Sequence, residues 1–209
     1  MRPLTAGTTL IFATLVCSTS AFFPSITSSR RDFVGALVGA ATVGLSTSPA
    51  QAKSIQYGEE SIMRQKGHGT SEKPVQQDLL FGVDRQLADK IVNYNRVFAE
   101  NSGYFRGTQW ESQVMNADGP ITYYDSVTGK PLFVAPVNRS KEEFLAESRL
   151  HGWPSFRDDE VVWDNVRVLK NSGETVSVDG SHLGHNLPDK KGNRYCINLV
   201  SVAGRPQAS

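Results

Sequence analysis

A cysteine near the end of the chain stands among side chains that could make it reactive. Arg194 precedes Cys196 by two residues, and Asn198 follows it by two. The thiolate is the nucleophilic form of cysteine, and at a thiol pKa near ~8.5 a neighbouring cation or donor must stabilise it. If "RYCIN" is a β-strand, alternate side chains share a face, so guanidinium, thiol and amide lie on one surface. This spacing predicts a nucleophilic cysteine.

Two histidines upstream of the cysteine could supply acid–base chemistry. The segment "SHLGH" contains His182 and His185, and Asp189 follows four residues later. An imidazole titrates near neutral pH, and a carboxylate can orient it and hold its tautomer. The alternative is an inert strand cysteine, because free cysteines are commonly buried. We favour the reactive interpretation, because a purely structural Cys196 does not require these polar neighbours.

The elements expected to position these side chains are mostly strands. Five segments are rich in β-branched and aromatic residues: "ITYY", "PLFVAPV", "EVVWDNVRVLK", "ETVSV" and "YCINLVSV". Residues 171–173, "NSG", suit a hairpin turn between two of them. Because strands and helices do not alternate regularly, we expect antiparallel sheets rather than a doubly wound parallel sheet. The predicted fold class is mainly β (α+β), with helices on the N-terminal side.

Two helices are predicted with their start signals. "DRQLADKIVNYNRVFAENSG" has apolar residues at helical spacing, with Asp84 as its cap and residues 101–103 as its end. "SKEEFLAESR" begins with Ser140 and Glu143 at the spacing of a capping box. Residues 53–80 are polar and predict a mobile arm. Within this arm His68 lies between glycines, which favours a solvated loop histidine over a metal ligand.

The first 52 residues predict a bipartite targeting sequence. Residues 1–21 combine one basic residue, an apolar run and a small-residue exit, as in a secretory signal, and the run is shorter than the ~20 residues of a membrane span. "RRDF", "VGALVGAATVGL" and "SPAQA" then resemble a twin-arginine export signal cleaved after Ala52. The alternative is one long signal or a membrane anchor. "STSAFFPS" resembles the cleavage motif of precursors that enter secondary plastids of algae, so we expect the thylakoid lumen of a plastid. A secreted or periplasmic protein is the alternative.

The remaining chain, from residue 53, predicts one neutral domain. Residues 1–52 hold three of the 22 Lys and Arg residues and one of the 21 Asp and Glu residues, which leaves 19 basic against 20 acidic residues. This balance argues against a nucleic-acid surface. About 150 residues suffice for one core, and we expect a monomer with no stable membrane span after processing. Cys17 lies in the predicted leader, so Cys196 can form no disulfide within the processed chain.

The motifs around Cys196 resemble a known enzyme family. "HLGHNLPD" and "RYCIN", together with "GWPSF" at residues 152–156 and "TGKPLF" at residues 128–133, resemble the B-type methionine sulfoxide reductases. These enzymes reduce the R epimer of methionine sulfoxide and repair oxidised proteins. The motifs occur in family order over residues 121–200, whereas residues 53–110 carry no matching motif. The resemblance implies two antiparallel sheets packed as in that family.

The resemblance also implies a function for each matched residue. Cys196 takes the position of the catalytic nucleophile, which becomes a sulfenic acid. Trp153 and Phe156 take the positions of substrate-binding residues, although "WPSF" alone would suit a plain core corner. The resemblance implies that the sulfoxide oxygen is bound and polarised by His182, His185 and Asp189. It also implies that the thiolate and the substrate are stabilised by Arg194 and Asn198.

The chain departs from the family at a zinc site. Many members bind structural zinc through two Cys-x-x-Cys pairs, and the corresponding positions here are Asp125, Thr128, Val176 and Asp179. Val and Thr cannot replace thiolates at a tetrahedral zinc site, so we expect no metal cofactor. Asp125 and Asp179 could form a weak metal site, but residues of hairpin turns are the favoured interpretation.

The chain also lacks the family's resolving cysteine, whose position is occupied by His151. The resemblance therefore implies an external reductant: a thioredoxin- or glutaredoxin-like protein or a small thiol. The expected substrates are proteins that contain methionine sulfoxide. Two alternatives stay open at this point. The domain could be a catalytically degenerate binding or assembly subunit, or it could reduce small-molecule sulfoxides.

Overall fold

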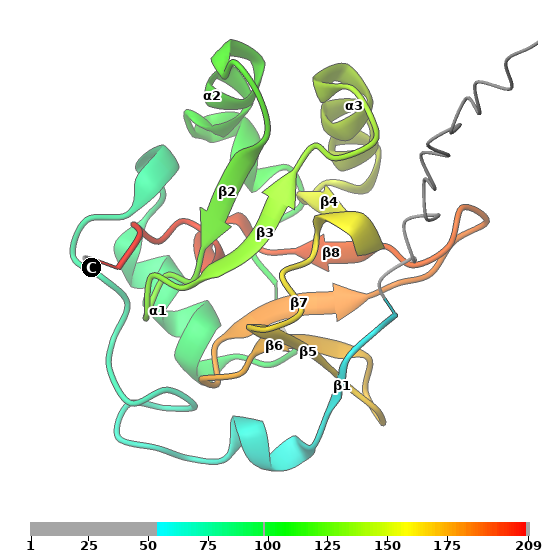
Figure 1. Cartoon of the computed structure of the whole chain (residues 1–209). Coiled ribbons are helices and arrows are strands. Elements are labelled where there is room, and N and C mark those ends of the chain that lie inside the picture. Colours follow the sequence, from blue (N-terminus) through cyan, green and yellow to red (C-terminus); the bar gives the residue numbers. More distant parts are fainter. Residues whose placement is uncertain (1–53, 98, 208–209) are drawn as a thin grey trace, which may run out of the picture. The chain divides into compact units, whose positions relative to one another are not determined.

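The β-rich segments of the C-terminal half assemble into a main sheet in the computed structural model (Figure 1). The structure describes residues 54–97 and 99–207, so the predicted targeting sequence, residues 1–52, lies outside the described residues. The six-stranded sheet has the order β1-β5-β6-β7-β8-β4, and β2 and β3 form a separate two-stranded sheet. The strands are β1 (Tyr57–Gly58), β2 (Ile121–Tyr124), β3 (Pro131–Ala135), β4 (Ser155–Phe156), β5 (Val166–Leu169), β6 (Glu174–Ser177), β7 (His182–Asn186) and β8 (Tyr195–Ile197).

The described part of the chain is thus a mixed α and β fold with two sheets. The pairings within the six-stranded sheet are antiparallel except that β1 pairs in parallel with β5, so this sheet is mixed and not purely antiparallel as expected. In this pairing Tyr57 lies opposite Val168, and Gly58 lies opposite Leu169. The prediction missed β1 because a strand of two residues has no detectable alternation.

Both predicted helices begin where their caps were expected. The Asp84 side chain accepts a hydrogen bond from the Leu87 amide at the start of α1 (Arg85–Tyr94). Ser140 and Glu143 form a reciprocal capping box at the start of α3 (Lys141–His151). A further helix, α2, spans Trp110–Asn116. The short 3-10 segments are Glu60–Met63, Leu80–Gly82, Tyr104–Gly107, Asp158–Glu160 and Leu199–Ser201.

Aromatic side chains from both sheets meet in one core. Phe156 of β4 stacks on Phe133 of β3 with ring centroids 4.3 Å apart, and its ring also meets Tyr123 of β2 and Phe144 of α3. These residues are fully buried. The core therefore joins the two-stranded sheet, α3 and the end of the main sheet.

Residues 54–80 pack against the rest of the domain, which differs from the expected mobile arm. Met63 is buried in a cluster with Leu169 and Val176. The Lys66 ammonium donates to the backbone carbonyls of Ile62, Thr70 and Asp179 at 2.6, 2.6 and 3.1 Å. Polar contacts of this kind leave no apolar pattern in the sequence. Within residues 54–97 and 99–207, no helix is long and apolar enough to cross a membrane.

Candidate functional site

Cys196 lies at the centre of a row of residues that crosses three strands. On β8 it is paired with His185 of β7 on one side and with Ser155 of β4 on the other. Directly opposed residues of antiparallel strands project from the same face of the sheet. An imidazole, a thiol and a hydroxyl therefore stand side by side. The neighbours Tyr195 and Ile197 are fully buried in the core, which confirms the predicted alternation of β8.

Gly184 lets β7 approach β8 at the thiol. A Cβ atom at Gly184 would lie 2.0 Å from the backbone oxygen of Cys196, a distance at which the two strands could not pack as they do. The glycine between the two histidines of "HLGH" is thus a requirement of the strand contact. It fixes His185 against Cys196 through the backbone.

The charge around the thiol comes from Arg194. Burial raises the pKa of Cys196, and a hydrogen bond and the positive charge of Arg194 act against this rise. Arg194 is itself 7% exposed, and its Nε and Nη1 atoms have no hydrogen-bond partner. The nearest carboxylate oxygen to Nε, that of Asp189, is 3.7 Å away. Buried guanidinium donors of this kind can bind a further acceptor or anion beside the sulfur.

Glu174 holds His182, and the prediction did not include it. Its Oε1 atom lies 2.8 Å from Nδ1 of His182, with both side chains nearly fully buried. Burial opposes ionisation of Glu174, but hydrogen bonds from His182 and Arg96 outweigh it and lower the pKa of the carboxyl. A carboxylate at Nδ1 fixes the tautomer that leaves Nε2 free. Glu174 is opposite His185 in the β6–β7 pairing, so an assumed hairpin register would have revealed it.

His185 is the imidazole next to the thiol. Its ring centroid lies 5.6 Å from that of His182. Burial and the neighbouring His182 lower the pKa of His185, so its ring is neutral at pH 7. A neutral imidazole can accept a thiol proton and then donate it as imidazolium. The pair is therefore suited to proton transfer at Cys196.

Asp189 binds arginines and does not orient a histidine. Its side chain accepts hydrogen bonds from Arg157 Nη1 and Nη2 at 3.1 and 2.8 Å. The hydrogen bond from Arg157, together with the charges of Arg157 and Arg194, keeps the pKa of Asp189 far below its usual range. The carboxylate that orients an imidazole is therefore Glu174. Asp189 instead contributes a negative charge close to Arg194.

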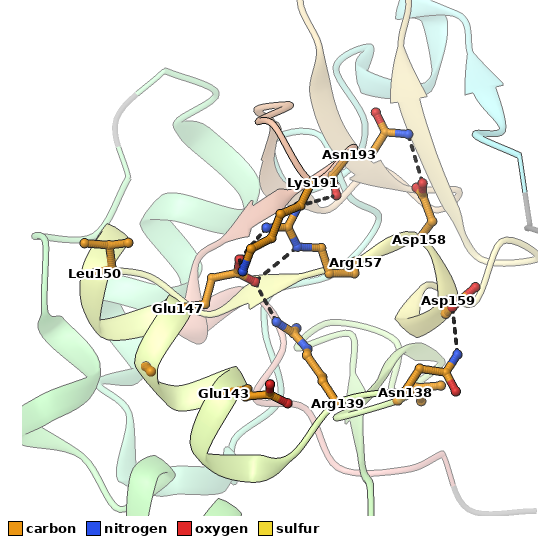
Figure 2. A pocket seen from close by; sticks show the side chains of 12 residues that line it. Asn138, Arg139, Glu143, Glu147, Leu150, Arg157, Asp158, Asp159, Lys191 and Asn193 are labelled. Carbon is orange, nitrogen blue, oxygen red and sulfur yellow. Dashed lines mark hydrogen bonds and ion pairs between the residues drawn. The ribbon is translucent and has the colours of Figure 1, made fainter.

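A cavity of about 670 Å³ is lined by residues of α3, of the segment 157–159 and of the segment that leads into β8 (Figure 2). Its floor carries an ion-pair network in which Glu147 binds both Arg139 and Arg157. Further along its wall, Asn138 binds Asp159 and Asn193 binds Asp158. Most of the charged groups lining the cavity are thus already paired with one another. Cys196 does not line it.

Trp153 and Asn198 are held by residue 100. The Trp153 indole donates to the Glu100 carbonyl at 3.0 Å, and the Asn198 Oδ1 atom accepts from the Glu100 amide at 3.1 Å. Asn198 also donates from Nδ2 to the Leu183 carbonyl. Both ends of this amide are therefore bound to backbone. Asn198 fixes the end of β8 against β7, while Trp153 is half-buried.

Two further predicted positions take different environments. Phe156 is fully buried and pairs with Tyr195, so it belongs to the core and its ring projects from the opposite face of β4 to Ser155. It is therefore not brought to the thiol. His151, at the end of α3, is half-buried. Burial and the charge of Arg194 lower the pKa of His151, which makes it a neutral neighbour of the site.

At the four positions that correspond to the family's zinc-binding cysteines, the two aspartates bind other side chains and backbone amides. The buried Asp125 carboxylate accepts from the Val127 amide at 2.7 Å and from the Ser181 hydroxyl at 2.9 Å. Asp179 forms an ion pair with Lys130 at 2.8 Å. Val176 is buried in an apolar cluster and offers no ligand. In the described part of the chain, no group of three or more His, Cys, Asp or Glu side chains could hold a metal ion.

A comparison of the chain with models of known protein families finds no match. The geometry of the site provides a half-buried thiol, a guanidinium with free donors, a neutral imidazole and a carboxylate-bound second imidazole. This set can ionise a cysteine, bind a polar oxygen beside it and move one proton.

Proposed function

We propose that this chain is a zinc-free, single-cysteine reductase of methionine (R)-sulfoxide in proteins, with the fold and site of the B-type methionine sulfoxide reductases. The observation that carries the proposal is the pair of free, buried donors on Arg194 beside the Cys196 thiol. A sulfoxide oxygen carries strong partial negative charge and accepts hydrogen bonds. It would supply the acceptor that these donors lack. The four sequence motifs add their specificity to this argument.

The reaction requires one proton, which is transferred twice within the site. His185 accepts the thiol proton, and the Cys196 sulfur attacks the sulfoxide sulfur. This attack forms a sulfur–sulfur bond, and the His185 imidazolium gives the proton to the sulfoxide oxygen. The hydroxyl group then passes to the Cys196 sulfur as the sulfur–sulfur bond and the sulfur–oxygen bond to the methionine sulfur break, which leaves Cys196 as a sulfenic acid. Two electrons pass from the cysteine sulfur to the methionine sulfur, and methionine leaves. The sulfenic acid is the first, reversible product of cysteine oxidation.

An external thiol completes the cycle. A thiolate of the reductant attacks the sulfenic sulfur and releases water, and a second thiol then cleaves the mixed disulfide and regenerates Cys196. The chain from residue 53 contains no other cysteine that could do this. We propose a thioredoxin- or glutaredoxin-like protein, or a small thiol, as the reductant. The leader motifs support the thylakoid lumen, where oxidised proteins would be the substrates and repair after oxidative stress the purpose.

The test uses both epimers of an N-blocked methionine sulfoxide with dithiothreitol as reductant. We expect turnover of the R epimer only and its loss in Cys196→Ser. Without reductant, the protein should form one methionine per chain and acquire one dimedone-reactive sulfenic acid. Absence of turnover with either epimer would contradict the proposal. Peptide-bound and free substrates, compared in the same assay, identify the preferred class.

A second candidate is a catalytically inactive binding or assembly subunit with the same fold. The observation in its favour is that burial raises the pKa of Cys196, which lowers the thiolate fraction at neutral pH. Thiol titration separates the two candidates. A Cys196 that stays unmodified by iodoacetamide in the native protein, together with stable retention in a membrane-bound complex, would favour the binding subunit.

A further inference from the structure

Residue 100 connects three parts of the candidate site through its backbone and side chain. Its carbonyl accepts from the Trp153 indole and its amide donates to Asn198 Oδ1. Its carboxylate oxygens accept from the amides of Leu199 and Val200 at 2.8 and 3.2 Å. These two amides belong to the 3-10 turn Leu199–Ser201 that follows β8 and Cys196. Glu100 is thus bound to Trp153, to Asn198 and to the turn after β8.

This carboxyl is buried at considerable cost. Glu100 is 2% exposed, and the hydrogen bonds described for its side chain come from backbone amides and not from a cation. Burial raises its pKa to about 7, even though the two backbone hydrogen bonds favour the ionised form. An apolar side chain would fill the same space without this cost. Strongly perturbed carboxyls in such places commonly have functions beyond packing.

The carboxyl also acts on the thiol electrostatically. The negative charge of Glu100 raises the pKa of Cys196, after the larger effect of burial and against the effect of Arg194. The pKa of the thiol is therefore lowered by a cation two residues away and raised by a carboxyl that binds the turn after β8. Position 100 lies in a segment for which the sequence offered no motif, so its connection to Cys196 is a result of the fold alone.

We propose that Glu100 is a positioning residue of the site, which holds Trp153, Asn198 and the turn after Cys196 in the one arrangement that accepts the substrate. The proposal rests on the proposed reductase function. Glu100 touches neither the thiol nor the substrate in this scheme. It acts through the Trp153 indole, at the proposed substrate-binding position, and through the side-chain amide of Asn198 directly after β8.

Two variants separate the effect of the charge of Glu100 from the effect of its side-chain length. Glu100→Gln keeps the length but replaces one accepting oxygen with an NH₂ group, which faces an amide donor and cannot accept from it. Glu100→Asp keeps the charge but is too short to bind both amides without movement of the turn. The matched control is Asp125→Asn, which also neutralises a buried carboxyl, one that binds Val127, Thr128 and Ser181 and none of the thiol's neighbours.

We expect the KM for the R epimer to rise roughly tenfold in both Glu100 variants, with a smaller change in kcat, and to stay unchanged in the control. Alkylation of Cys196 should reach its half-maximal rate at lower pH in Glu100→Gln but not in Glu100→Asp. The Trp153 indole signal in ¹H–¹⁵N spectra, assigned with Trp153→Phe, should shift in both. Unchanged KM and an unchanged indole signal in folded variants would overturn the proposal.

Two controls keep this proposal separate from the proposed function. If the wild-type protein reduces neither epimer, the reductase function fails, and the indole signal and alkylation profile still decide whether Glu100 organises the site. If neither variant folds, the wild-type protein is titrated through pH 7 instead. The Trp153 indole and Asn198 amide signals should then move together with one midpoint, and signals that do not move would overturn the proposal.

Discussion

At Cys196, two opposing effects on one thiol decide whether the residue can react. Burial raises its pKa, and the adjacent guanidinium lowers it. We therefore expect Arg194→Met, which removes the charge and keeps much of the stem, to raise the thiol pKa further. Alkylation by iodoacetamide at pH 8 should slow by roughly tenfold, since one pKa unit is a tenfold change in thiolate. The measurement is the alkylation rate from pH 6 to 10.

The control for this variant is Arg149→Met. Arg149 is half-exposed on α3 and forms an ion pair with Glu111. The same change of side chain at this position should leave the alkylation profile of Cys196 as it is in the wild type. An Arg194→Met profile that coincides with that of the control would mean that the guanidinium does not act on the thiol.

Glu100 predicts an unusual dependence of stability on pH. Its pKa is about 7 in the folded protein and 4.5 is the ordinary value. Between these values the unfolded chain has already lost the proton that the folded chain retains, so the free energy of unfolding falls as pH rises. We expect Glu100→Gln, which does not titrate, to gain stability relative to wild type from pH 4.5 to 8, by roughly 3 kcal/mol. Urea unfolding at both pH values measures this difference, and a constant difference would contradict it.

Individual residues were predictable from the sequence where neighbours in the chain are also neighbours in space. Arg194 and Cys196 satisfy this condition, since Arg194 directly precedes β8 and its hydrogen bond and charge act on the thiol. Asn198 directly follows β8, and its side chain binds the backbone of Leu183 and Glu100 instead. Glu174 and Glu100 do not satisfy the condition, since the first reaches His182 through a hairpin register and the second reaches the site from about 100 residues away. Asp189 was expected near an imidazole by its spacing. Arg157, which no local pattern connects with it, binds it instead.

The contact between β7 and β8 depends on a glycine, Gly184, which has no Cβ atom. Because a Cβ atom at Gly184 would lie 2.0 Å from the Cys196 carbonyl oxygen, Gly184→Ala must push the two strands apart. We expect a loss of roughly 1–3 kcal/mol in the free energy of unfolding. His185 would also move away from the thiol, so reductase activity should fall more than the folded fraction does. Urea unfolding and the epimer assay measure the two effects.

Gly107 offers a matched control for this substitution. A Cβ atom at Gly107 would meet nothing within 4 Å. Gly107→Ala should therefore leave both stability and activity close to the wild-type values. Equal effects of the two substitutions would mean that the close approach of β7 and β8 at the thiol does not matter.

Whole elements were predictable where start signals and periodicity agree. The caps of α1 and α3 identified the first residues of both helices. Their ends were less certain: α1 stops at Tyr94, several residues before the expected Asn-Ser-Gly signal. Likewise "YCINLVSV" reads as one strand, yet β8 ends at Ile197 and a 3-10 turn follows. The Glu100 carboxylate binds the amides of that turn, and a tertiary contact of this kind is invisible to local periodicity.

At the scale of the whole molecule, the two sheets are joined by polar contacts as well as by the aromatic core. The Ser181 hydroxyl, just before β7, lies 2.9 and 3.0 Å from the two oxygens of Asp125, just after β2. Burial raises the pKa of Asp125, and its hydrogen bonds stabilise the charge. Asp125 stands at one of the positions at which the zinc-binding B-type methionine sulfoxide reductases, which the sequence resembles, carry cysteines. We infer that the hydrogen bonds between Ser181 and Asp125 connect the two sheets at a place where a zinc ion would connect them in those enzymes.

The last prediction follows from these hydrogen bonds. Ser181→Ala removes a donor from a buried carboxylate, so we expect a loss of roughly 1–3 kcal/mol in the free energy of unfolding. Ser61→Ala, at an exposed position, should cost nothing measurable. We also expect prolonged EDTA treatment to leave the calorimetric unfolding transition of the wild type unchanged, because the Asp125 carboxylate already accepts hydrogen bonds from Ser181 and Val127. A lowered transition after chelation, or one zinc ion per chain in native mass spectra, would show that the connection between the sheets requires a metal after all.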